Sequence, residues 1–154
     1  MLIVDLHLST GVVSCRDVVS DAHKQACEAD SMSLKFLEYI LDSEKPNFVA
    51  FTGDQVNGDT SPNAKSVPSL ICLFLMFKAI FKFAELCIDR QIPYAAIFGN
   101  HDDEGDLSRE ELMEVLTELP YCVAKPGLKE IRGVGNYVVA IEKQLYPPNS
   151  VLFN

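Results

Sequence analysis

The sequence predicts an α/β domain with a mainly parallel sheet flanked by helices. Three short apolar runs, at residues 1–4, 47–52 and 94–98, each end in a polar or glycine-containing turn. Continuous apolar runs of this length are typical of strands buried on both faces of a parallel sheet. Helical patterns fill the gaps between the runs, and this alternation predicts a βαβαβα order with right-handed crossovers.

Three helices are expected. The first covers residues 26–41, where leucine and isoleucine side chains recur on one face. The second covers about residues 70–90 and ends before a proline. The third, over residues 108–119, begins with a capping box in which Ser108 and Glu111 satisfy each other's backbone donors.

One further strand is expected at residues 137–141, and residues 142–154 are interpreted as an irregular tail because they show no periodicity. A chain of 154 residues has room for one domain. We place that domain at residues 1–141.

The composition is globular and acidic. Hydrophobic residues make up 48% and charged residues 23%, which is enough apolar surface for a core. The formal net charge of −9 argues against a nucleic-acid partner, because basic surfaces bind such partners. The start of the chain is too short and polar for a secretory signal, and the longest apolar run, Val67–Phe77, is well under the ~20 residues that span a bilayer. We therefore expect no membrane segment and, by default, a cytoplasmic location.

The five cysteines form no metal-type spacing with one another or with histidine. An odd and scattered set favours buried free thiols over a disulfide framework. We expect free thiols at Cys15, Cys27, Cys72, Cys87 and Cys122.

Metal-type side chains follow each of the three strands. Asp5 and His7 come after the first strand, Asp54 after the second, and Asn100 and His101 after the third. Ligands bind at the carboxyl ends of parallel strands, so these side chains are expected to converge. Asp5 and His7 are two residues apart and lie on the same side of an extended chain. Carboxylate, imidazole and amide ligands suit borderline divalent ions such as Mn²⁺, Fe²⁺ or Zn²⁺.

Each motif alone carries little information. An Asp-x-His pair is common by chance, Gly53-Asp54 can be a simple turn, and the acidic run at residues 102–104 is typical of a solvated loop. The prediction of a metal site depends on their succession after three strands. The glycines before Asp54 and Asn100 allow tight turns and close backbone approach.

Three blocks of sequence resemble the first three signature blocks of calcineurin-like metallophosphoesterases: Asp5-Leu-His7, Gly53-Asp54-Gln-Val-Asn57-Gly58 and Gly99-Asn100-His101-Asp102. Longer strings around them are similar to the fungal purple-acid-phosphatase-like subgroup. The resemblance extends over nearly residues 1–141. It implies the N-terminal half of a two-sheet sandwich flanked by helices, so the domain would be truncated.

The resemblance also implies two divalent metal ions. Asp5 and His7 would hold the first ion, Asp54 would bridge both, and Asn100 would hold the second. Two ions ~3.5–4 Å apart clamp a phosphate and activate water for in-line displacement.

In the same family, the position of His101 lies near the leaving group, as general acid or transition-state stabiliser. Asp102 is the neighbouring acid expected to orient it. The implied activity is hydrolysis of a phosphoric ester, with phosphoproteins, diesters and small monoesters all open as substrates.

The sequence departs from the family after the third block. The family completes its site with downstream histidines, but this chain has none after His101, and His23 is interpreted as a solvated or capping residue. The second metal would keep only Asp54 and Asn100, so its site is expected to be incomplete. The alternative function is therefore a truncated, inactive pseudo-phosphatase or fragment that binds at most one metal and acts, if at all, through a partner.

Residues 67–78 interrupt the resemblance. The similarity to the family would be continuous if Ser66 were joined directly to Ala79. The segment is either an insertion or an extension of the second predicted helix. Both interpretations stay open from the sequence.

Overall fold

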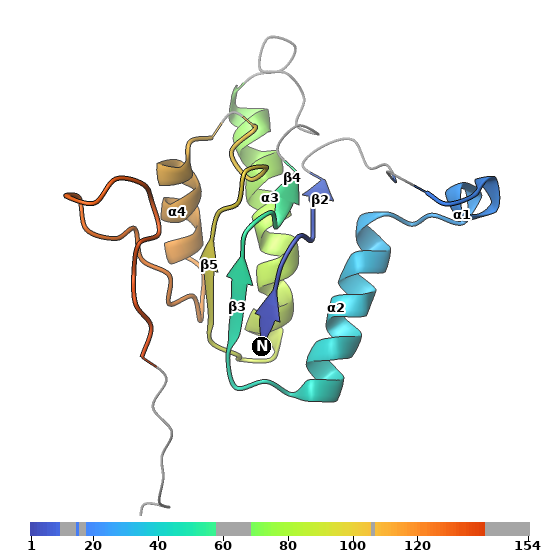
Figure 1. Cartoon of the computed structure of the whole chain (residues 1–154), viewed down its shortest axis with the longest axis horizontal. Coiled ribbons are helices and arrows are strands. Elements are labelled where there is room, and N and C mark those ends of the chain that lie inside the picture. Colours follow the sequence, from blue (N-terminus) through green and yellow to red (C-terminus); the bar gives the residue numbers. More distant parts are fainter. Residues whose placement is uncertain (10–14, 16–17, 58–68, 106, 141–154) are drawn as a thin grey trace, which may run out of the picture.

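The computed structural model describes residues 1–9, 15, 18–57, 69–105 and 107–140. Its main sheet is parallel, with the strand order β1 (Leu2–Ile3), β3 (Val49–Thr52) and β5 (Tyr94–Ile97). The helices are α1 (Asp21–Gln25), α2 (Asp30–Glu44), α3 (Ser69–Asp89) and α4 (Arg109–Thr117). This arrangement confirms the α/β class with mainly parallel strands flanked by helices (Figure 1).

A second, two-stranded parallel sheet continues beyond the first. It pairs β2 (Leu8–Ser9) with β4 (Val56–Asn57), the segments that follow β1 and β3 after sharp bends. These two strands were not predicted, because two residues are too few to give a periodic pattern. Their pairing keeps the chain segments on either side of the two bends close together.

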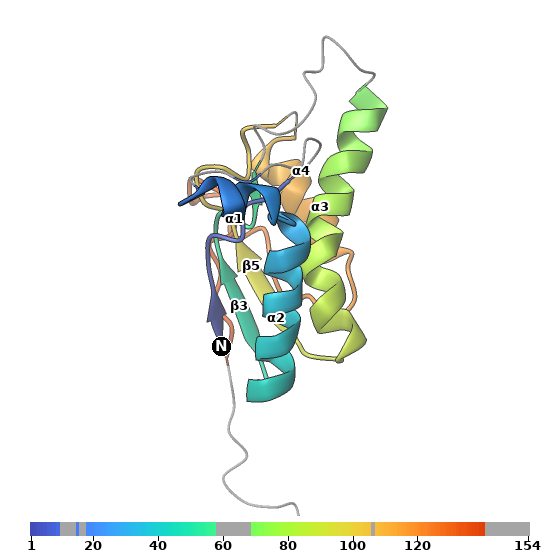
Figure 2. The same cartoon turned by 90° about the vertical axis from the view of Figure 1, so that its right-hand side faces the viewer.

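Helices α2 and α3 cover one face of the main sheet (Figure 2). The ring of Phe51 in β3 lies between Phe83 of α3 and Tyr94 of β5, with centroid distances of 4.7 and 6.1 Å. All three side chains are buried. Burial of aromatic rings of this size contributes strongly to stability, so β3 and β5 hold the loops at their carboxyl ends on a rigid base.

All three predicted helices are present, as α2, α3 and α4, and their ends differ from the predicted ones. Helix α2 begins at Asp30 rather than at residue 26 because Ala29 has a left-handed φ of 46°, which a continuing helix cannot contain. The capping box at Ser108 and Glu111 is confirmed at the start of α4.

The strand predicted at residues 137–141 is wrong for the described residues 137–140, which are not in a strand. The chain turns at Gly133 and Gly135, which both have positive φ, and then contacts the sheet through one side chain. The hydroxyl of Tyr137 donates to the carbonyl of Ala96 at 2.8 Å.

Residues 69–78 form the first half of α3, with Phe74 and Phe77 on its exposed surface. Whether this segment is an insertion stays a prediction, as does the domain boundary at residue 141. The tail at 142–154 lies outside the described residues. Among the helices described, none combines the length and apolar character needed to cross a membrane.

Candidate metal centre

The candidate site is built on two bends of the backbone. Asp5, His7 and Asp54 have φ of 54°, 46° and 52°, the left-handed region that non-glycine residues seldom adopt. The bends are held together because Asp5 N–H donates to Gly53 O at 3.2 Å and His7 N–H donates to Asp54 O at 2.9 Å. Unfavourable backbone of this kind clusters at functional sites, where the surrounding structure enforces it.

The bends bring the three side chains together. His7 Nε2 lies 3.6 Å from Asp5 Oδ1, and one ligand atom from each of Asp5, His7 and Asp54 lies within 4.8 Å of the others. Two carboxylates and one imidazole fit a borderline divalent ion, which would also relieve the proximity of two negative charges. The chain between Asp5 and His7 is bent rather than extended, so the pair converges for a different reason than the sequence predicted.

Two other predicted residues lie on the loop after β5. The backbone N–H of His101 donates to Asp54 Oδ1 at 2.8 Å, and its ring lies edge-on to that of His7 with centroids 5.0 Å apart. Asn100 precedes His101 on this loop and is exposed. The structure therefore brings His101 against the acid and histidine group, with Asn100 beside it in the chain.

Two glycines allow this close approach of the loops. A Cβ at Gly53 would lie 2.7 Å from the backbone nitrogen of Gly99, and one at Gly99 would collide with the carboxylate of Asp54. Real Cβ atoms do not approach so closely, so both positions need glycine, as the sequence predicted.

Asp102 is buried beneath the two loops. Its Oδ2 accepts the N–H groups of Asp54 at 2.8 Å and Gly99 at 2.7 Å, and its Oδ1 accepts that of Val56 at 2.9 Å. Burial raises the pKa of this carboxyl, and the three backbone hydrogen bonds act against that rise. Asp102 thus ties the loop after β3 to the loop after β5.

The two acidic residues after Asp102 pair with Arg109 and with the ring of His101. Asp103 Oδ2 accepts from Arg109 Nε at 2.8 Å, and this guanidinium lowers the pKa of Asp103. Arg109 also donates to Gly99 O at 2.8 Å. Glu104 Oε2 lies 2.8 Å from His101 Nδ1. Glu104 therefore contacts the ring that Asp102 was expected to orient, and only the i,i+3 spacing could have indicated this.

A polar cluster anchors the chain just after His7. The carboxylate of Asp30, at the start of α2, accepts both the N–H and the hydroxyl of buried Ser9. Lys82 of α3 pairs with the same carboxylate and donates to Ser9 O. This cluster connects β2 to two helices, and sequence spacing offered no sign of it.

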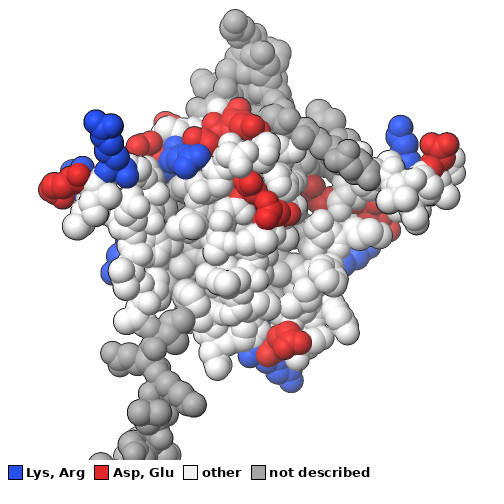
Figure 3. Space-filling model, viewed as in Figure 1, with Lys and Arg blue, Asp and Glu red and all other residues white. Residues whose placement is uncertain are grey.

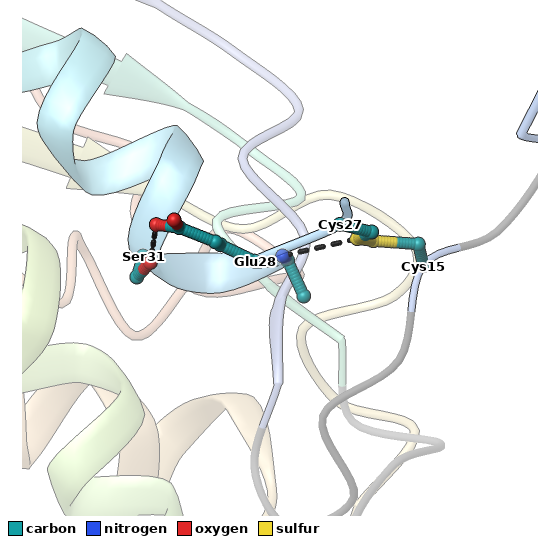
Figure 4. The surroundings of a disulfide bond; sticks show 5 residues. Cys15, Cys27, Glu28 and Ser31 are labelled. Carbon is teal, nitrogen blue, oxygen red and sulfur yellow. Dashed lines mark hydrogen bonds between the residues drawn. A yellow bond between two sulfur atoms is a disulfide. The ribbon is translucent and has the colours of Figure 1, made fainter. Parts of the chain in front are cut away.

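The cysteine prediction is wrong for one pair, because Cys15 and Cys27 form a disulfide (Figure 4). Their Cα atoms are 6.4 Å apart, within the usual range for a disulfide. The two cysteines have a sequence separation of 12, a spacing that does not by itself indicate a disulfide. Cys87 and Cys122 are free thiols as expected, and burial raises the pKa of Cys87 to about 12. The side chain of Cys72 lies outside the described part of the structure.

Acidic side chains gather near the carboxyl ends of β3 and β5, with basic side chains beside them, in the upper part of the view in Figure 3. Phosphate is an anion, so an acidic surface of this kind attracts it only if bound cations dominate the local charge. The charge distribution therefore suits a metal ion more directly than it suits a bare anionic ligand.

Comparison with known proteins gives a consistent result. A family model described as calcineurin-like phosphoesterase matches residues 17–145. An uncharacterised protein of Schizosaccharomyces pombe is 40% identical over 135 residues, which cover 88% of this chain and 24% of that protein. Phosphatase DCR2 of Saccharomyces cerevisiae is 38% identical over 90% of this chain and 22% of its own length.

A plant protein named probable inactive purple acid phosphatase 28, from Arabidopsis thaliana, is 30% identical over 99% of this chain and 37% of its own length. The chain thus spans about a quarter to a third of the length of these relatives.

Proposed function

Because the chain belongs to the calcineurin-like phosphoesterase family, we propose that it takes part in divalent-metal-dependent hydrolysis of phosphoric esters. The observation that supports this most is the convergence of Asp5, His7 and Asp54 from two separate bends, with ligand atoms within 4.8 Å of one another. A relative with phosphatase in its name is 38% identical to it.

Asp5, His7 and Asp54 would hold one divalent ion, and Asp54 and Asn100 would contribute to a second. When bound, such ions lower the pKa of coordinated water and offset the negative charge of a phosphate. Asp54 is suited to a shared position because it follows β3, the central strand of the main sheet, between the segments that follow β1 and β5. Its Oδ1 accepts the N–H of His101 at 2.8 Å.

His101 would serve the leaving group as general acid. Its backbone is fixed to Asp54 and its ring lies beside that of His7, so the ring is next to the proposed ligands. General acid catalysis typically contributes about 10²–10⁴-fold to a rate. Asp102 would act as a positioning residue for Asp54, since its buried carboxylate accepts backbone N–H groups of the loop after β3.

A second candidate is a module that binds one metal without turnover. It is favoured by plant relatives whose names include the word inactive, and by the grouping of ligand atoms for one ion by Asp5, His7 and Asp54. In that case the first ion would bind and the second would not.

Hydrolysis of p-nitrophenyl phosphate over a Mn²⁺ titration separates the two, with metal binding followed by calorimetry on the same samples. Asp54→Asn removes a proposed ligand, and Asp89→Asn, an exposed carboxylate at the end of α3, is the matched control. Activity that Asp54→Asn abolishes and Asp89→Asn retains would support the hydrolase. Binding of Mn²⁺ with no turnover at any concentration would support the second candidate, and no binding would overturn both.

A further inference from the structure

Three acidic residues follow His101, and each has a different partner. Asp102 accepts three backbone N–H groups, and Asp103 pairs with Arg109. Glu104 reaches the ring of His101, with 2.8 Å between its Oε2 and Nδ1. The first two carboxylates hold the loop in place, and among these three acids it is Glu104 that contacts the imidazole.

His101 is held at both its backbone and its ring. Its N–H donates to Asp54 Oδ1, and the turn back to Glu104 is closed by Glu104 N–H donating to His101 O at 3.4 Å. Both side chains of the pair are about one-third exposed, so the ring of His101 lies at the protein surface rather than in the core. A hydrogen bond to one imidazole nitrogen sets which nitrogen carries the proton in the neutral ring.

We propose that Glu104 is the positioning residue for His101: it holds a proton on Nδ1 and so makes Nε2 the nitrogen that serves the leaving group. The protonated ring donates its Nε2 proton to the departing alkoxide as the P–O bond breaks, and the neutral ring that remains keeps its proton on Nδ1, toward Glu104. This inference rests on the proposed function for its catalytic meaning. The pairing itself can be measured without turnover.

The pairing is tested by the tautomer of His101 in the metal-free chain labelled with ¹⁵N at histidine. Long-range ¹H–¹⁵N spectra are recorded about two units above the ordinary imidazole pKa of ~6.5. The chain has three histidines, and His101→Gln assigns the signal. The wild type is expected to show the Nδ1–H form, whereas a solvated imidazole favours Nε2–H.

Glu104→Ala should return His101 to the Nε2–H form, and Glu104→Gln should retain Nδ1–H because its amide oxygen still accepts. Glu114→Gln, an exposed carboxylate of α4, is the matched control and should leave the spectrum unchanged. Backbone amide spectra of the same samples verify the fold. An Nε2–H form in the wild type, or no change in folded Glu104→Ala, would overturn the proposal.

Kinetics with Mn²⁺ then test the catalytic meaning. Glu104→Ala should lower kcat by roughly 10–100-fold with KM little changed, the usual range for a residue that orients a catalytic group. The loss should be larger for phenyl phosphate than for p-nitrophenyl phosphate, because the more basic leaving oxygen depends more on the acid. Equal losses for both esters, or an undiminished kcat, would overturn this role for Glu104. If the tautomer behaves as expected but no chain hydrolyses either ester, the proposed function fails while the pairing stands.

Discussion

Asp102 Oδ2 accepts the backbone N–H of Asp54 at 2.8 Å, and this bond connects the loop after β5 to the loop after β3. The same carboxylate accepts the N–H groups of Gly99 and Val56. The position of Asp54 in the candidate site therefore depends on a residue that is buried beneath the site.

Asp102→Asn should lower the free energy of unfolding by about 2–3 kcal/mol, because its amide nitrogen would face backbone donors and leave them unsatisfied. Mn²⁺ affinity should fall by at least about tenfold, the usual consequence of losing an outer support of a metal site. Urea unfolding and calorimetry measure the two effects. Asp89→Asn, which changes an exposed carboxylate, should alter neither, and a stable Asp102→Asn with normal affinity would contradict this role.

Asp5→Asn should raise the stability of the metal-free chain slightly while removing its response to metal. The substitution removes a negative charge beside Asp54, and asparagine tolerates the left-handed φ of 54° well. We expect the melting temperature without metal to be equal to or above that of the wild type. The rise that Mn²⁺ causes in the wild type should disappear. A lower metal-free melting temperature would argue against strain and charge repulsion at this position.

Arg109→Gln should destabilise the chain at neutral pH more than in acid. Arg109 lowers the pKa of Asp103, so the pair stabilises the fold above the ordinary aspartate pKa of ~3.9 and loses that contribution as pH falls through the lowered value. Because the pair is partly exposed, the effect at pH 7 should be no more than about 1 kcal/mol.

Urea unfolding of wild type and Arg109→Gln at pH 7, and at the lowest pH where both unfold cooperatively, measures the difference. Burial raises the pKa of Asp102, which contributes with the opposite sign in both proteins. Arg109 also interacts electrostatically with Asp102 and Asp54, more weakly than with Asp103, so the difference between the variants reports mainly Asp103. A difference in stability that does not change with pH would contradict the ion pair.

Cys15→Ser should lower the free energy of unfolding by about 2–3 kcal/mol, because the disulfide closes a loop with a sequence separation of 12 residues. Reduction of the wild type by a dithiol should have the same effect, and should have none on the variant. Cys122→Ser, at a free thiol, is the matched control. Thiol labelling under denaturing conditions counts the reactive cysteines. An oxidised wild type in which all five react would contradict the disulfide.

The main strands and helices could be predicted because each carries a pattern in its own residues. The apolar runs at β1, β3 and β5 and the capping box at Ser108 are local signals. The β2–β4 sheet could not be predicted, since its pairing depends on bends rather than on composition. The helix predicted from residue 26 begins only at Asp30, directly after the positive φ of Ala29, and the sequence pattern does not indicate this backbone angle.

Strand-end placement singled out Asp5, His7, Asp54, Asn100 and His101. The structure places Asp5, His7, Asp54 and His101 close together, and their role as a site stays a prediction. The partners of the neighbouring acids depend on loop conformation, so Glu104 was missed. The disulfide likewise joins two positions with no shared pattern.

The left-handed backbone at Asp5, His7 and Asp54 bears on how this domain would change under relaxed selection. Such angles are uncommon in residues other than glycine, and glycine would adopt each of them at no steric cost. A copy that no longer needed to coordinate a metal could therefore accept glycine at each of these three positions without steric cost at the bend. Under the proposed function, the ligand role accounts for the side chains at bends where glycine would suit the backbone best.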